Sequence, residues 1–61
     1  MNTRIEQLQM ISDCEKRDTQ LSDYEAKFID SISLYMDKAG FLSIKQDSML
    51  EAIWNRVTEK G

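Results

Sequence analysis

Hydrophobic side chains recur along this chain at the spacing of an α-helix, most clearly over residues 22–39. One face of a helix with this span would carry the apolar side chains Tyr24, Phe28, Ile29, Ile32, Tyr35, Met36 and Ala39. Ser22 and Glu25 form an S-x-x-E capping box, which marks the start of the helix independently of its apolar face. The pattern predicts a helix over 22–39 that packs on one side.

The same design repeats over residues 43–59. Ser43 and Gln46 form an S-x-x-Q capping box, and one face would carry Met49, Leu50, Ile53, Trp54 and Val57. The opposite face is expected to be solvated and carries Asp47, Ser48, Glu51, Asn55 and Glu59. Between the two helices, Gly40 suits a left-handed C-terminal position, and Phe41 is expected to fold back on the preceding turn as in a Schellman motif. Because the connection is so short, we expect the two helices to be antiparallel neighbours.

A third helix is predicted over residues 3–15. Thr3 and Glu6 form a T-x-x-E capping box, and one broad side would carry Ile5, Leu8, Ile11 and Cys14. The polar stretch 16–20 is interpreted as a loop or as an extension of this helix. The sequence therefore predicts a single all-α domain over 1–61, a small three-helix bundle built on an antiparallel helical hairpin. In the alternative, the first helix swings out to pair with another chain.

Length and composition narrow the remaining choices. A chain of 61 residues buries only about 60% of its unfolded surface, so self-association or docking on a partner is a common source of extra stability. With one cysteine and no histidine, an internal disulfide and the usual zinc sites are unavailable. No apolar stretch predicts a membrane span or a signal sequence, which favours the cytoplasm.

Catalytic and ligand-binding signatures are missing from the sequence. Without histidine, a second cysteine or a glycine-rich loop, nucleophile–base pairs and phosphate cradles cannot be assembled. A calcium loop centred on Gly40 would place Tyr35, Ala39 and Gln46 at ligand positions one, five and twelve, where they cannot replace the usual oxygen ligands. We therefore expect no enzyme activity, no cofactor and no metal.

A helix-turn-helix is the alternative interpretation of the segment around Gly40. Lys45, Gln46 and Ser48 at the start of the last helix could read bases in a major groove. The net charge is −3, however, from 11 acidic and 8 basic side chains. DNA binding would require the scattered basic residues to converge in the fold; they include Arg4, Lys16, Arg17, Lys45, Arg56 and Lys60.

Two apolar residues lie off the predicted apolar faces. Leu34 projects from the polar side of its helix, and Ile44 is similarly placed on the next one. Single exposed apolar residues are common on protein surfaces. The alternatives are that Leu34 contacts the first helix, or that Leu34 and Ile44 contact a partner protein.

The helix pair carries one further pattern, L-S-x-x-E-x-x-F-I-x-S-I from Leu21 to Ile32, followed by L-S-x-K-Q-x-x-x-L-x-x-I from Leu42 to Ile53. It resembles a helix pair found in small phage-encoded and replication-associated bacterial proteins, and it covers about half of the chain. The resemblance implies a phage or mobile-element protein that works near nucleic-acid machinery, and it transfers no catalytic residue. The sequence thus favours a non-enzymatic interaction module that binds and modulates a protein of nucleic-acid metabolism or host defence.

Overall fold

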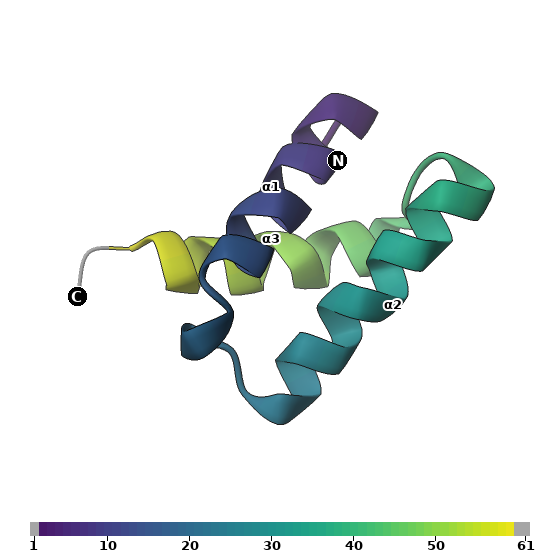
Figure 1. The fold of residues 1–61 in the computed structure, drawn as a ribbon. Helices are drawn as coiled ribbons and strands as arrows, with labels where there is room; N and C mark the ends of the chain where they lie inside the picture. The colour runs from purple at the N-terminus through teal and green to yellow at the C-terminus, as the bar shows by residue number, and fades with distance from the viewer. Residues whose placement is uncertain (1, 60–61) are drawn as a thin grey trace.

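The computed structural model describes residues 2–59, which form an all-α bundle of three helices (Figure 1). Helix α1 spans Arg4–Lys16, α2 spans Asp23–Ala39 and α3 spans Ile44–Thr58. A single 3₁₀ turn, Asp18–Gln20, replaces the loop expected between the first two helices. The predicted fold class is confirmed, and each helix boundary lies close to its predicted position.

All three helices begin with the capping box that the sequence predicts. The side chains of Thr3, Ser22 and Ser43 each accept a hydrogen bond from the backbone N–H three residues later. In return, the side chains of Glu6, Glu25 and Gln46 accept from the backbone N–H of the capping residue at 2.9 Å. These reciprocal bonds satisfy backbone donors that the helix itself leaves without partners, which fixes where each helix starts.

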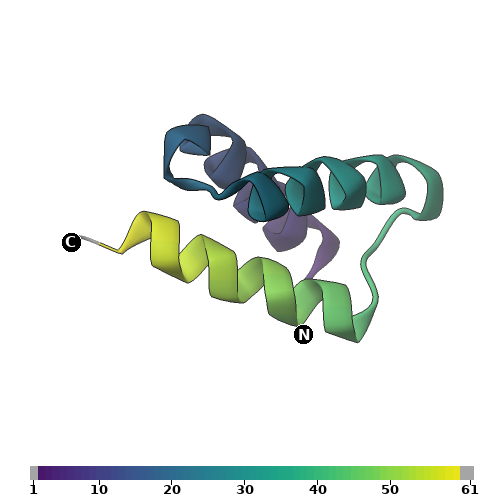
Figure 2. The same ribbon diagram turned by 90° about the horizontal axis from the view of Figure 1, so that it is seen from below.

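The packing centre is α1, which contacts α3 extensively and α2 to a lesser degree, while α2 and α3 contact each other least. Seen from below, α2 and α3 run in opposite directions, as expected of the hairpin (Figure 2). They are inclined to one another, however, and do not lie side by side along their lengths (Figure 1). Helix α3 therefore makes most of its contacts with α1, and not with α2, its predicted hairpin partner.

The core consists of side chains from all three helices and from the α2–α3 turn. Its buried members are Met10, Ile11, Cys14, Ile29, Ile32, Met36, Leu42, Leu50, Ile53 and Val57, with Leu21, Phe28 and Trp54 packed at its edge. Between helices, the Trp54 indole N–H donates to the Asp13 carboxylate of α1 at 3.0 Å, and Arg56 of α3 forms an ion pair with Glu25 of α2.

Two predicted apolar faces are wider than the buried ones. On α2, Tyr24, Tyr35 and Ala39 are exposed, because the helix packs through a narrow strip at Ile29, Ile32 and Met36. On α1, Ile5 and Leu8 are exposed, whereas Ile11 and Cys14 are buried as predicted. The buried face of α1 is completed by Gln7 and Met10, one helical turn before Ile11 and Cys14.

The α2–α3 turn differs from the expected Schellman motif. Gly40 is left-handed as predicted, with φ 86°, but its N–H donates to the Met36 carbonyl at 2.8 Å, which is the simpler αL ending. Phe41 points away from the core with 62% of its surface exposed, and Leu42 is fully buried in its place. The turn is therefore attached to the core by the Leu42 side chain, and Phe41 does not fold back on α2.

We predict that Gly40→Ala destabilises the protein by about 1 kcal/mol, the cost of a left-handed conformation for a residue with a Cβ atom. No atom lies within 4 Å of a Cβ built at this position, so steric overlap adds nothing. Urea unfolding should rank the variants Gly40, Gly40→Asn and Gly40→Ala from most to least stable, because Asn tolerates this conformation better than Ala. Equal stability of Gly40 and Gly40→Ala would contradict the prediction.

Candidate functional site

Four large apolar side chains are exposed near the α2–α3 turn. Leu34 and Tyr35 lie in the second half of α2, Phe41 lies in the turn and Ile44 is the first residue of α3. Their exposed fractions are 62% for Leu34, 42% for Tyr35, 62% for Phe41 and 75% for Ile44. We call these four the turn-end apolar residues.

The predicted partner-binding residues Leu34 and Ile44 are both exposed, as their off-face positions imply. Sequence reasoning missed Tyr35 and Phe41, which it assigned to the core and to a folded-back turn. Phe41 could not be recognised because Phe41 and Leu42 are adjacent apolar residues, and the chain direction after Gly40 decides which of them is buried.

The residues of the DNA-binding alternative lie in different environments. Lys45 and Ser48 are exposed near the start of α3, but the Gln46 side chain is half-buried and accepts the Ser43 backbone N–H in the capping box. The intervening Asp47 is buried, with 3% of its surface exposed. Lys45 and Ser48 are thus available to a ligand, whereas Gln46 already holds a structural bond.

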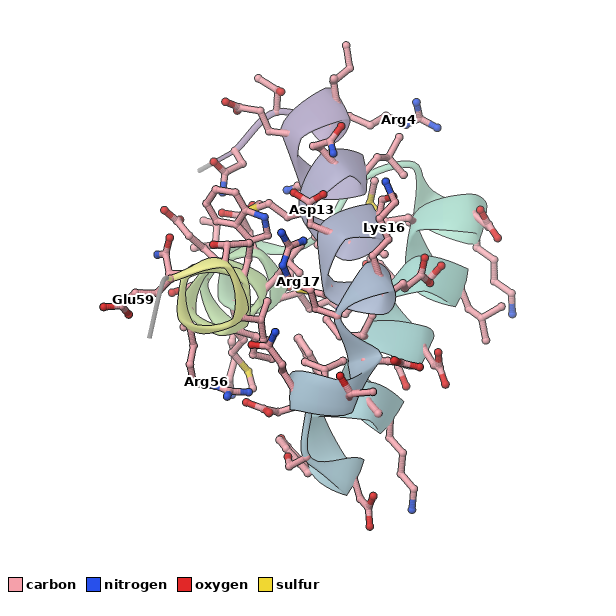
Figure 3. All side chains as sticks on the ribbon, turned by 60° about the vertical axis from the view of Figure 1, so that its left-hand side comes forward. Arg4, Asp13, Lys16, Arg17, Arg56 and Glu59 are labelled. Carbon is pink, nitrogen blue, oxygen red and sulfur yellow. The ribbon has the colours of Figure 1, made fainter. Side chains whose placement is uncertain are left out.

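Basic side chains are spread over the molecule (Figure 3). Arg4 lies at the start of α1, whereas Lys16 and Arg17 lie at its other end. Arg56, near the end of α3, donates to Gln20 and pairs with Glu25, so its charge is partly neutralised. Lys45 is at the opposite end of α3, and Lys60 is outside the described residues. Lys16, Arg17 and Arg56 therefore lie away from the start of α3, where Lys45 and Ser48 are found.

A buried polar network joins α1, the turn and α3, and it corrects the prediction that Asp47 lies on a solvated face. The Gln7 amide nitrogen donates to the Asp47 carboxylate at 2.9 Å, and the Gln7 oxygen accepts the Leu42 backbone N–H at 3.0 Å. Asn2 also donates to Asp47, from its backbone N–H and from its side-chain amide. Among the described residues, no buried side-chain nitrogen or oxygen lacks a partner.

This network keeps a charge in the interior. Burial opposes ionisation of Asp47, but the hydrogen bonds from Gln7 and Asn2 outweigh that effect and lower the pKa of the carboxyl below its usual value. Because Gln7 and Asp47 engage each other and nearby backbone groups, we interpret the network as a structural element that holds α1 against α3.

The outer side of the α1–α3 contact forms a groove of about 260 Å³. Its lining residues are Asn2, Glu6, Gln9, Met10, Glu51 and Trp54. The hydrogen bond from the Trp54 indole fixes the aromatic ring and lowers the pKa of Asp13, which accepts it. The groove thus combines an apolar floor with two exposed carboxylates, those of Glu6 and Glu51.

A second groove, of about 310 Å³, lies between the end of α1 and the start of α2. It is lined by the apolar side chains of Leu21, Ala26 and Ile29 and by three acidic residues, Glu15, Asp18 and Asp30. The described acidic residues are not arranged for metal binding, since no group of three or more His, Cys, Asp or Glu side chains in 2–59 could hold a metal ion.

Cys14 is fully buried in the core, as its predicted place on the apolar face of the first helix implies. Burial raises the pKa of its thiol to about 11, so the reactive thiolate is scarce at neutral pH. We interpret Cys14 as a small core residue.

No protein-family model, curated protein or solved structure matches the chain. Within residues 2–59, none of the helices has the length and apolar character that a membrane crossing requires.

We predict that the contribution of Asp47 to stability depends on pH. Its pKa is lowered in the folded state, so the contribution is present above the unfolded value of about 4 and is lost as pH falls through the folded-state pKa. Asp47→Asn should therefore lose about 1.5–3 kcal/mol of unfolding free energy at pH 7, the range for hydrogen bonds to a charged group. The difference from wild type should shrink towards pH 3.

Urea unfolding at pH 7, 5, 4 and 3 measures this effect. Asp30→Asn, a change at an exposed position on α2, is the matched control and should stay close to wild type. A constant difference between wild type and Asp47→Asn across this range would contradict the ionised network.

Proposed function

We propose that this chain is a non-catalytic interaction module that binds a folded partner protein through the turn-end apolar residues. The observation that carries the proposal is the exposure of Leu34, Phe41 and Ile44, each at 62% or more, around one connection of a 61-residue chain. Several exposed large apolar side chains in one region can mark an interaction site, and a few side chains that become buried in a complex dominate the energetics of protein interfaces.

The class of partner follows from the resemblance of the helix pair to small phage-encoded and replication-associated proteins. On that basis we propose a cytoplasmic, phage-encoded module that modulates a protein of nucleic-acid metabolism or host defence. Modulation by binding suits a chain in which the side chains of Gln7, Asp47 and the three capping boxes already have structural partners.

We predict that the double variant Leu34→Lys/Ile44→Lys stays folded but loses the partner. Both positions are exposed, so added charge is tolerated by the fold, while an apolar interface would have to bury two ammonium groups. The matched control is Ser31→Lys/Asn55→Lys, which adds the same charge at exposed positions on the same two helices. Circular dichroism should show equal helicity for all three proteins.

The measurement has two stages. Affinity capture from bacterial lysate should retain a defined protein on wild type and on the control, but not on Leu34→Lys/Ile44→Lys. The purified partner should then bind wild type and the control with similar Kd values, and the double variant at least about tenfold more weakly.

Two results would overturn the proposal. One is equal binding of the partner by all three proteins. The other is a dimeric mass for wild type in sedimentation that becomes monomeric in Leu34→Lys/Ile44→Lys, which would assign the turn-end apolar residues to self-association.

DNA binding through Lys45, Gln46 and Ser48 is the alternative proposal, and a mobility-shift assay separates it from the interaction module. If the chain is an interaction module, we expect micromolar protein to cause no shift of a random-sequence duplex at low salt, where electrostatic attraction is strongest. The exposed face of α3 near Lys45 also carries Glu51, which repels phosphate. A shift that is present in wild type and abolished by Lys45→Glu would replace the interaction module with the DNA-binding alternative.

A further inference from the structure

A second binding surface lies away from the turn-end apolar residues, in the groove between α1 and α3. The Trp54 and Met10 side chains form its apolar part, and Glu6 of α1 and Glu51 of α3 approach it from the two helices. None of the described residues that line it is basic. Its chemistry is therefore apolar and acidic at once.

The Trp54 ring is held in place from two directions. Its apolar part packs against the core, and its indole N–H donates to Asp13 at 3.0 Å. The ring remains half-buried, so part of it faces the groove. A fixed indole ring is the best aromatic partner for a cation, since the negative face of the ring attracts positive charge.

The two glutamates keep capacity for another hydrogen bond. Glu6 accepts the Thr3 backbone N–H, and Glu51 accepts from the Asn2 side-chain amide at a long 3.4 Å. Each carboxylate offers about four acceptor sites, so both can still receive donors from a ligand. Both side chains are exposed, so a ligand can reach them from solvent.

The size of the groove limits the ligand. At about 260 Å³ it is smaller than the ~300–1,000 Å³ of most small-molecule pockets, and it suits a single long side chain. An arginine side chain combines the required features, because its aliphatic stem packs on apolar surface, its guanidinium stacks on aromatic rings and its donors match carboxylates.

We propose that the groove between α1 and α3 is a docking site for an arginine side chain of a partner protein, with Trp54 as the stacking surface and Glu6 and Glu51 as the acceptors. The site does not depend on the turn-end apolar residues. It implies that the partner protein presents an exposed arginine to the groove. The charge of the groove complements that of the ligand, and the net charge of −3 favours approach of a basic segment.

The single tryptophan of the chain is Trp54, so its fluorescence reports on this groove directly. The probe is a blocked glycine–serine peptide with three spaced arginines, titrated at low salt against the full chain. The controls are the same peptide with citrulline in place of arginine, which keeps the shape but removes the charge, and the same peptide with lysine. We expect saturable change of Trp54 emission with the arginine peptide, a weaker response with lysine and none with citrulline.

Two double variants with the same net charge separate binding in the groove from attraction by the net charge of the protein. Glu6→Gln/Glu51→Gln removes two charges from the groove and keeps the capping box, since Gln also serves at that position. Glu15→Gln/Asp30→Asn removes two charges from the groove between α1 and α2. The first variant should bind the arginine peptide about fivefold more weakly than wild type, and the second should stay within about twofold.

Equal weakening by both variants would show attraction by net charge alone and would overturn the proposal. An equal response to citrulline and arginine peptides would do the same, because the occupant would then be uncharged. Leu34→Lys/Ile44→Lys changes no residue that lines the groove and should keep the saturable response of Trp54 to the arginine peptide, so failure of the proposed function and failure of this site are distinguishable.

Discussion

The side chain of Gln7 joins three parts of the molecule, and their arrangement depends on this junction. Its oxygen accepts the Leu42 backbone N–H, and its nitrogen donates to the Asp47 carboxylate. The bonds connect α1 to the turn after α2 and to the first turn of α3, across 35 and 40 residues of sequence. Because a buried carboxylate is unfavourable unless it is hydrogen-bonded, Asp47 can be buried only when α1 is seated.

The same helix, α1, is also the packing centre of the bundle. Packing α2 and α3 along their lengths would have made a hairpin core, whereas the two helices are inclined and contact each other least, so α1 makes the larger contacts with both. Met10, Ile11 and Cys14 are the core residues of α1, and the Trp54–Asp13 bond holds the other end of its contact with α3. The first helix is thus tied to α3 near both of its ends, by Gln7 and by Asp13.

The limits of sequence-based prediction are visible in the same residues. Capping boxes at Thr3, Ser22 and Ser43 are local, so helix starts were predicted correctly. Gln7 and Asp47 were missed because apolar periodicity ignores polar residues, although Gln7 has the i, i+3, i+4, i+7 spacing with Met10, Ile11 and Cys14. The burial of Gln7 could have been recognised from its position, because this polar residue occupies a place on the apolar face of the helix. The exposure of Leu34 and Ile44 was predictable from their positions on the polar sides of their helices. The Trp54 groove, in contrast, depends on how α1 and α3 cross, which the sequence pattern does not give.

The burial of Asp47 also shapes the surface that a partner meets. An exposed Asp47 would have stood beside Lys45 and Ser48, and its move into the interior leaves α3 with Ile44, Lys45 and Ser48 outward at the turn end. Likewise, burial of Leu42 turns Phe41 outward. The junction that seats α1 therefore determines which side chains are displayed around the turn. The core and the proposed interface are consequences of one packing arrangement: Gln7 draws Leu42 and Asp47 inward, and their neighbours face the solvent.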